Sequence, residues 1–283
     1  EVLKHATLID GMVYDGLFDP YGNHLMGNIA EKMAREAGIT REEQDNHATR
    51  SYSSAARAQS LGNFNLELVP IYAKHLVQGS GTATAPNGVL SSAASVSNSN
   101  SNDMILASDE EIENFLRVDR LPKLDPAFEE HGTITAGNSS KIADGASALI
   151  LASGTFVKQH NLKPIARILA HADIEVDPQQ YPIASARAIP VALQRARMDI
   201  KDVDYYEINE AFSSVSILVN RQLNLNPAHV NIYGGSVALG HPIGSSGSRI
   251  LTTLTSVLRQ TSGSIGVAAI CNGGGGGTCL VIE

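Results

Sequence analysis

Residues 28–61 have the polar and apolar pattern of two consecutive helices. Apolar residues four positions apart form one stripe of the first helix: Ile29, Met33 and Ala37. Gly38 ends this stripe. Directly after it, Thr40 and Glu43 have the spacing of a capping box, in which each side chain accepts a hydrogen bond from the other residue's backbone N–H. The pattern therefore predicts a helical hairpin.

The residue pattern in the middle of the chain predicts two strands separated by an insertion. Residues 66–72 have the apolar content of a strand. Residues 79–103 are rich in Ser, Asn, Ala and Gly without an apolar period, so we expect a mobile surface insertion there. Between residues 132 and 153, a Gly, Asn and Ser turn precedes the apolar run 148–152. This run predicts a buried strand.

The second half of the chain alternates regularly between strand and helix patterns. Strands are predicted at 164–171, 203–208, 265–270 and 278–282, and helices at 182–198, 210–223 and 245–259. A glycine-rich turn joins the last two strands. This order indicates an α/β protein with a mixed sheet and helices packed on its faces.

Composition and charge narrow the class of protein. The chain of 283 residues is 43% hydrophobic and 18% charged, which is typical of a globular protein with a sizeable core. Its net charge of -8 and the lack of Lys and Arg runs argue against a nucleic-acid partner. The longest apolar stretches are too short to cross a membrane, so no membrane role is expected. Two cysteines cannot form a disulfide scaffold, which favours a reducing compartment.

Two predicted loops carry residues suited to acid and base chemistry. Asn209 follows a predicted strand, where it is either a helix cap or part of a site. His241 lies in the glycine-rich loop 234–244, where an imidazole can act as a general base. A loop histidine without a role is the alternative interpretation.

The third candidate segment contains a cysteine followed by a run of glycines. Cys271 precedes five consecutive glycines among residues 273–277, which favours close approach of backbone N–H groups to a ligand. The thiol can be a nucleophile, an acid and base, or a small buried apolar group. Cys279 has apolar neighbours in a predicted strand and is expected in the core. Together these segments indicate acyl transfer, without deciding between a hydrolase and a condensing enzyme.

These segments resemble, in order and spacing, signature blocks of the thiolase family. The blocks are Asn-Glu-Ala-Phe at 209–212, Gly-Gly-Ser-Val-Ala-Leu-Gly-His-Pro-Ile-Gly-Ser-Ser-Gly at 234–247 and Cys-Asn-Gly-Gly-Gly-Gly at 271–276. Further family-like blocks lie at 15–19, 26–31, 132–140 and 144–146. The resemblance covers the whole chain except the insertion and is nearest to the biosynthetic, acetoacetyl-CoA type.

The resemblance implies a fold that this chain contains only in part. Thiolases pack two similar α/β halves into a five-layered α/β/α/β/α body, to which a helical loop domain is added. Residues 1–131 are expected to form the loop domain, 132–163 a remnant of the N-terminal half, and 164–283 the C-terminal half. Because the N-terminal half is incomplete, we expect the isolated polypeptide to be unstable or to need the remainder of that half.

The resemblance also implies roles for individual residues. His241 would deprotonate the nucleophilic cysteine and donate to the thioester oxygen, while Asn209 would hold a water in the same oxyanion hole. Cys271 would be the acid and base, and Gly273 would offer its N–H to a second oxyanion hole. Ser140 would bind the pantetheine arm of CoA. Further apolar residues would line its tunnel: Leu17, Met26, Phe128, Ala136, Ala211 and Phe212.

The implied activity is that of an acetyl-CoA C-acetyltransferase, which condenses two acetyl-CoA into acetoacetyl-CoA and CoA through an acyl-cysteine, as in the mevalonate pathway. Neither Cys271 nor Cys279 aligns with the family's nucleophile, so this chain alone is expected to be inactive. One alternative is a catalytically inactive CoA-binding fragment or protein, and another is a hydrolase that uses Cys271. Many family members have His immediately before the methionine that Met26 matches, whereas this chain has Leu25 there and His24 one place earlier. The substrate contacts at this corner are therefore expected to depart from the family.

No cofactor or metal is expected beyond the CoA thioesters that serve as substrates. A homodimer or homotetramer in the cytosol is expected from the family, with the mitochondrion as the alternative compartment.

Overall fold

A computed structural model describes residues 8–72, 105–106 and 109–283 of the chain. The predicted insertion at 79–103 lies outside the described residues. The helices are α1 (Met26–Glu36), α2 (Arg41–Ser60), α3 (Gly154–Gln159), α4 (Ala184–Ala196), α5 (Ser213–Leu223), α6 (Ser236–Leu239) and α7 (Ile243–Gln260). The strands are β1 (Phe18–Asp19), β2 (His24–Leu25), β3 (Ile71–Tyr72), β4 (Ile105–Leu106), β5 (Ile168–Glu175), β6 (Tyr205–Ile208), β7 (Gly266–Cys271) and β8 (Gly276–Ile282).

Four of these strands form the central sheet, in the order β5-β8-β7-β6. β6 and β7 run parallel, with Ile208 opposite Ala269, while β8 is antiparallel to both of its neighbours. The parallel pair needs a long crossover, which α5, α6 and α7 provide between β6 and β7. The predicted mixed sheet and α/β class are thus confirmed.

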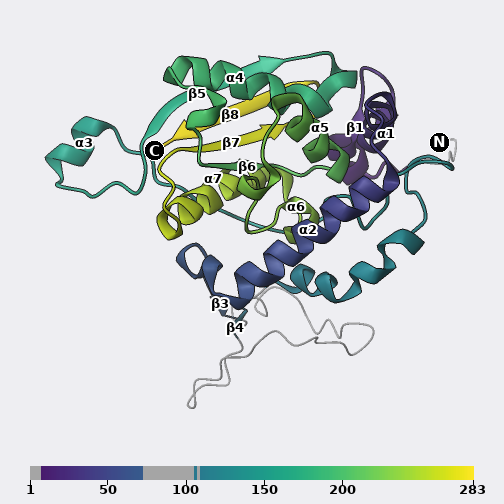
Figure 1. Ribbon diagram of the computed structural model, residues 1–283, viewed down its shortest axis with the longest axis horizontal. Coiled ribbons are helices and arrows are strands. Elements are labelled where there is room, and N and C mark those ends of the chain that lie inside the picture. The colour runs from purple at the N-terminus through teal and green to yellow at the C-terminus, as the bar shows by residue number, and fades with distance from the viewer. Residues whose placement is uncertain (1–7, 73–104, 107–108) are drawn as a thin grey trace, which may run out of the picture.

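Helices cover both faces of this sheet (Figure 1). Along β7, Val267 and Ala269 belong to the apolar cluster that α4 and α5 complete, whereas Ala268 between them belongs to the cluster of α7. This alternation follows from the two-residue period of a strand. The result is one α/β/α unit, so the described residues hold a single large sheet rather than the five layers expected for the complete family fold.

The helical hairpin of α1 and α2 confirms the first prediction from sequence. Thr40 accepts a hydrogen bond from the N–H of Glu43 at 3.2 Å, and the Glu43 carboxylate accepts one from the N–H of Thr40 at 2.8 Å. Both halves of the capping box are therefore formed. α2 lies across the lower part of the body in Figure 1 and packs against α5 and α6.

Replacing Thr40 with alanine is expected to destabilise the protein by about 1 kcal/mol, because one N–H at the start of α2 loses its acceptor. The midpoint of urea unfolding measures this loss. Thr40→Ser keeps the hydroxyl and serves as the matched control. Equal destabilisation by both changes would contradict a capping role.

The expected strand at 66–72 is mostly wrong. The chain forms a 3₁₀ turn at Asn63–Leu66, and only the two residues of β3 are extended. The carboxylate of Glu67 accepts hydrogen bonds from Thr253 (3.2 Å) and Ser256 (2.8 Å) of α7, which fixes this segment as a loop over that helix. These hydrogen bonds to a helix distant in the sequence outweigh the strand preference of the local apolar pattern.

The apolar run 148–152 also differs from its prediction as a buried strand. It has no regular structure, and Ile150 and Leu151 are 98% and 74% exposed. Nearby, Ser147 contacts the start of α7 through Ser245 (2.8 Å). A strand needs a hydrogen-bonded neighbour, and no strand in the described part of the chain pairs with this run.

Three boundaries in the second half shift by a few residues. β5 begins at Ile168 rather than 164, because its pairing with β8 sets its register. The helix predicted at 182–198 begins as a 3₁₀ turn, Pro178–Ile183, before α4. α5 begins at Ser213 rather than 210, because residues 211–213 exchange backbone hydrogen bonds with 138–140. Among the described residues, no helix is long and apolar enough to cross a membrane.

Candidate active site

Two of the predicted site residues follow the parallel strands β6 and β7 at the same edge of the sheet. Asn209 comes directly after β6, and its N–H donates to the carbonyl of Ala269 in β7 at 2.9 Å. Cys271 is the last residue of β7. The carboxyl edge of parallel strands is where α/β proteins commonly build their sites. The sheet therefore places the amide and the thiol on neighbouring strand ends.

The side chain of Asn209 joins a chain of hydrogen bonds rather than capping a helix. Its Oδ1 accepts from the Ser236 hydroxyl at 2.6 Å, and its Nδ2 lies 3.1 Å from His241 Nε2. α5 starts four residues later, with Phe212 at its N-cap position. The alternative interpretation of Asn209 as a helix cap is therefore wrong.

The loop that carries His241 is held by the segment 141–145. The N–H of His241 donates to the carbonyl of Lys141 at 2.8 Å. Gly240 has a φ of 86°, and a Cβ on it would lie 2.5 Å from the Cβ of Ala143. Only glycine fits this close approach at positive φ. A cleft lined by residues 143–147 and 242–245 opens next to this loop.

Hydrogen bonds define the protonation pattern of the His241 ring. The Ser246 hydroxyl donates to the carbonyl of Pro242 at 3.0 Å, which leaves its oxygen to accept from Nδ1 of His241 at 2.6 Å. Nδ1 then carries the proton, and Nε2 accepts from Asn209. Burial, reinforced by the positive charge of Arg249, lowers the pKa of His241 to about 4. The ring is thus a neutral base whose lone pair is on Nε2.

The His241 ring is expected to stay neutral, with its proton on Nδ1, at every pH from 8 down to about 5, because its pKa is lowered to about 4. NMR of the protein with ¹⁵N-labelled histidine measures both the tautomer and the titration. His241→Asn identifies the signal. Protonation of this ring above pH 6 would contradict the proposed environment.

Cys271 is buried with a protonated thiol. Burial raises its pKa to about 12, although a hydrogen bond from Ser185 acts in the opposite direction. Tyr181, whose hydroxyl donates to the carbonyl of Met26 at 3.0 Å, belongs to the same apolar cluster as Cys271. Beyond the thiol, a Cβ on Gly273 would lie 3.2 Å from Sδ of Met26. The turn after β7 therefore lies against the start of α1.

Most of the predicted apolar lining residues gather around this thiol. Phe128 and Phe212 meet edge to face at 5.7 Å and pack in one cluster with Met26, Ala211 and Cys271. Ser140 lies beside them, because its N–H donates to the Ala211 carbonyl at 3.1 Å.

Two predicted lining residues are not shown to be part of this cluster. Leu17 is half-buried in the turn Val13–Leu17. Ala136 is exposed, and its carbonyl accepts from the ammonium group of Lys141. No hydrogen bond links His241 to Cys271 in the described part of the chain.

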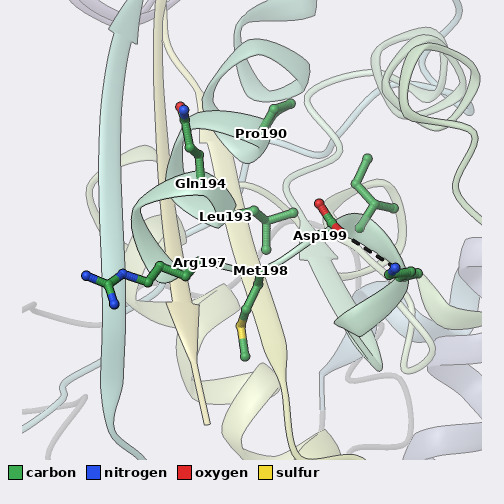
Figure 2. A pocket seen from close by; sticks show the side chains of 8 residues that line it. Pro190, Leu193, Gln194, Arg197, Met198 and Asp199 are labelled. Atoms are coloured by element: carbon green, nitrogen blue, oxygen red, sulfur yellow. Dashed lines mark ion pairs between the residues drawn. The ribbon is translucent and has the colours of Figure 1, made fainter.

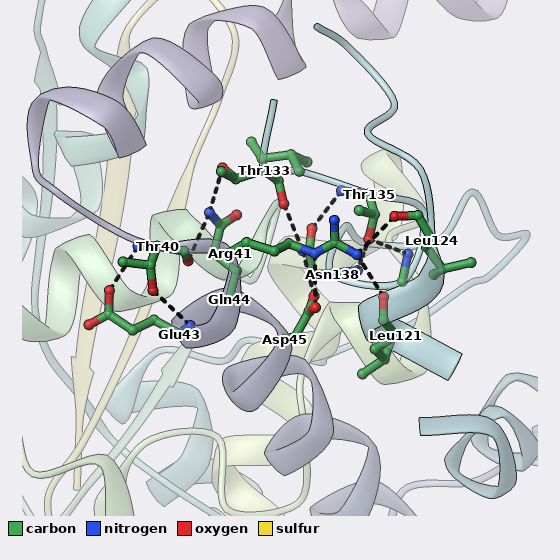
Figure 3. Close-up of polar contacts among 12 residues, drawn as sticks. Thr40, Arg41, Glu43, Gln44, Asp45, Leu121, Leu124, Thr133, Thr135 and Asn138 are labelled. Carbon is green, nitrogen blue, oxygen red and sulfur yellow. Dashed lines mark hydrogen bonds and ion pairs between the residues drawn. The ribbon is translucent and has the colours of Figure 1, made fainter. Parts of the chain in front are cut away.

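A polar network ties the loop 133–140 to α2, as Figure 3 shows. Arg41 donates to the carbonyls of Leu121 and Leu124 at 2.7 and 2.9 Å and to Asp45 at 2.8 Å. Asp45 in turn accepts from the amide of Asn138 at 2.9 Å. The helical hairpin thus fixes the position of the neighbouring Ser140.

A second anchor is the buried carboxylate of Glu210, next to Asn209. It accepts hydrogen bonds from His47 (2.9 Å) and Ser51 (2.7 Å) of α2, and from the amide of Asn231 (3.1 Å). Burial alone would raise the pKa of Glu210, but the charge of His47 and these three hydrogen bonds outweigh it and lower the pKa to about 2. A carboxylate at this position therefore holds α2 against the edge of the sheet that carries the site.

A separate groove lies at the end of α4 (Figure 2). Pro190, Leu193, Gln194, Arg197, Met198 and Asp199 line it, together with Ile200 and Lys201. None of the residues predicted for the site contributes to this groove. It is therefore not the candidate active site.

The sequence predictions missed several polar residues that contact the site. Ser236 and Ser246 lie within the glycine-rich block at 234–247, so their position beside His241 was the available signal. Ser185 and Arg249 lie within helices and contact Cys271 and Ser236 respectively. No local pattern distinguishes these two from ordinary helix residues.

Comparisons with known proteins agree with the family resemblance. The family model of the thiolase N-terminal domain matches residues 1–155, and that of the thiolase C-terminal domain matches residues 162–283. The cytosolic acetyl-CoA acetyltransferase ERG10 of Gibberella zeae is 44% identical over 98% of this chain. An acetyl-CoA acetyltransferase of Saccharomyces cerevisiae is also 44% identical over 98%. The chain spans 64% and 65% of the lengths of these two relatives.

Solved structures of similar proteins cover nearly the whole chain. Acat5 thiolase from Ascaris suum, in complex with coenzyme A, matches with a TM-score of 0.84 and 38% identity over 98% of this chain and 65% of its own. Human mitochondrial 3-ketoacyl-CoA thiolase matches with a TM-score of 0.87 and 35% identity over 100% of this chain and 65% of its own.

Proposed function

Since the chain belongs to the thiolase family, we propose that the protein acts as an acetyl-CoA C-acetyltransferase. The reaction joins two acetyl-CoA into acetoacetyl-CoA and CoA and is reversible. The observation that carries this proposal is the placement of Asn209, with the His241 it contacts, and Cys271 on neighbouring strand ends. The names of the similar acetyl-CoA acetyltransferases support the choice of substrate.

In the first step, His241 acts as the base. Its Nε2 lone pair takes the proton of a cysteine thiol, and the thiolate attacks the carbonyl carbon of acetyl-CoA. The ring N–H formed in this way then donates to the thioester oxygen, with a water held by Asn209 as the second donor. The tetrahedral intermediate collapses to an acetyl-cysteine and releases the CoA sulfur. The acyl-accepting cysteine is proposed to lie outside these 283 residues.

The raised pKa of Cys271 supports a role as an acid first and a base second. A thiol that is protonated at rest enters the cycle as an acid and protonates the departing CoA sulfur. It thereby becomes a thiolate in an apolar environment, which is a strong base. This thiolate removes the α-proton of the second acetyl-CoA, and the resulting carbanion attacks the acetyl-cysteine. The adduct collapses to acetoacetyl-CoA and expels the cysteine sulfur, which takes back the proton held by His241. Cys271 is then a protonated thiol again, so the proton balance closes.

The remaining predicted residues are proposed to bind the substrate. The N–H of Gly273 would stabilise the enolate oxygen of the second acetyl-CoA. Ser140 would bind the pantetheine arm, and the apolar lining would be formed by Leu17, Met26, Phe128, Ala136, Ala211 and Phe212. A CoA complex of a similar thiolase supports CoA as a ligand. The proposed reaction uses no metal and no bound cofactor.

Assembly and location are proposed from the family and its members. We propose a homodimer or homotetramer. A cytosolic location is supported by the name of the similar cytosolic acetyl-CoA acetyltransferase from Gibberella zeae.

The experiment is a thiolysis assay of these 283 residues together with the proposed segment that carries the acyl-accepting cysteine, using acetoacetyl-CoA and free CoA and quantifying acetyl-CoA. Formation of two acetyl-CoA for each acetoacetyl-CoA consumed is the expected result. CoA binding without turnover would favour the inactive CoA-binding alternative. Thioester hydrolysis in the absence of CoA would favour a hydrolase that uses Cys271, and either outcome would overturn the proposal.

A further inference from the structure

Arg249 reaches the proposed site from α7, although the mechanism above assigns it no step. Its Nη2 donates to the hydroxyl of Ser236 at 3.0 Å. Its Nη1 is buried, makes no hydrogen bond, and lies 3.6 Å from a carboxylate oxygen of Glu207 in β6. The Arg249 side chain is 19% exposed, and Ser236 is fully buried. Ser236 is therefore the hydrogen-bond acceptor that holds this guanidinium in place.

The hydrogen bond from Arg249 to Ser236 determines the orientation of the Asn209 side-chain amide. An arginine only donates, so the hydrogen of the Ser236 hydroxyl is free to point toward Oδ1 of Asn209 at 2.6 Å. Nδ2 of Asn209 then faces Nε2 of His241 at 3.1 Å. The reversed amide would place an oxygen against Nε2 and favour a proton on that nitrogen. The chain from Arg249 to His241 thus keeps the Nε2 lone pair available.

The charges around Arg249 also favour a His241 ring that is not protonated on Nε2. Glu207 in β6 and Glu67 before β3 both interact with Arg249, and Glu210 lies close enough to influence Glu207. The pKa of Glu207 is raised to about 8, mainly by burial and also by the charges of Glu67 and Glu210, while Arg249 acts in the opposite direction. A mostly protonated Glu207 at neutral pH leaves the charge of Arg249 free to oppose protonation of His241.

We propose that Arg249 is a positioning residue: through Ser236 and Asn209 it fixes the tautomer of His241 in which Nε2 can accept a proton. This inference rests on the proposed function, because only a reaction that uses His241 as a base needs that tautomer. Arg249 itself does not contact the substrate. Ser246 favours the same tautomer from the other side of the ring, so loss of Arg249 is expected to mix the tautomers rather than reverse them.

The test compares the variants Arg249→Met and Ser236→Ala by NMR with ¹⁵N-labelled histidine. Both variants are expected to show a mixture of the two neutral tautomers of His241. Only Arg249→Met is also expected to raise the pKa of His241, since Ser236→Ala retains the positive charge. The matched control is Arg50→Met, which removes a partly buried arginine that donates to the carbonyl of Pro227 instead. An unchanged tautomer in both variants, or an equal change in the control, would overturn the inference.

Kinetics on the same proteins separates positioning from a structural role. Arg249→Met and Ser236→Ala are each expected to lower kcat for thiolysis by about 100-fold, as small misplacements of catalytic groups do, with little change in KM for CoA. The control Arg50→Met is expected to keep kcat. An unchanged kcat despite mixed tautomers would overturn the positioning role. Because the tautomer is read without turnover, an inactive wild-type protein would refute the proposed function alone.

Discussion

Replacing Cys271 with alanine is expected to lower kcat for thiolysis by about 1000-fold, within the range usual for removing a general acid or base. The reason is that the thiol is the proposed proton donor to departing CoA and the proposed base toward the α-carbon. The same variant should lose exchange of the acetyl-CoA α-protons with deuterated water. That exchange, followed by mass spectrometry, isolates the proton-transfer step from the rest of the reaction.

Cys279→Ala is the matched control for this prediction. Cys279 is also a buried thiol, in β8, but it packs within the core cluster of α4 and α5 rather than at the end of the sheet. Its replacement removes the same atoms and is expected to cost stability while leaving kcat nearly unchanged. If both variants lost activity equally, a packing defect would explain the result. Retention of activity by Cys271→Ala would exclude the proposed role.

Replacing Glu210 with alanine is expected to destabilise the protein by about 3–5 kcal/mol, as measured by urea unfolding. Its carboxylate is buried and accepts hydrogen bonds from side chains of α2, so alanine leaves these donors without a partner. Glu210→Gln keeps the volume but removes the charge. It is also expected to be costly, because its NH₂ group would face other donors.

The pH dependence of this loss follows from the lowered pKa of Glu210. The folded pKa of about 2 lies below the ordinary value of 4.5, so the stabilisation is complete above about pH 4.5 and is lost as the pH falls toward 2. The difference in stability between the wild type and Glu210→Gln should therefore shrink in that range.

Glu129→Ala is the control for an exposed pair. Its contact with Arg35 at 3.0 Å leaves both side chains accessible to water, so its removal is expected to leave the midpoint of urea unfolding nearly unchanged. A loss for Glu210→Ala no larger than that of the control would contradict the proposed anchor.

The elements that the sequence predicted well are those held by local interactions. The capping box at Thr40 and Glu43 forms within four residues, and the hairpin of β7 and β8 is closed by its own glycine-rich turn. The segments around Asn209, His241 and Cys271 could likewise be selected from sequence, because each combines polar groups and glycines at a predicted strand end or helix start. Their roles came from the family resemblance and remain proposals.

The other features could not be predicted because they depend on contacts between residues that are far apart in the sequence. The loop before β3 depends on Glu67 reaching α7, and the buried Glu210 depends on α2, more than 150 residues earlier in the chain. The run 148–152 carries the pattern of a strand, but a strand forms only where another one supplies its hydrogen bonds. Pattern alone contains no information about that partner.

By itself, the sequence determined the α/β class, the hairpin and the three segments that carry the candidate chemistry. Only the tertiary structure decided that Asn209 contacts His241, that Ser236 and Arg249 lie behind it, and that the thiol of Cys271 is buried. The physical reason is that backbone periodicity and caps act over a few residues, whereas burial and side-chain hydrogen bonds depend on elements brought together by the sheet.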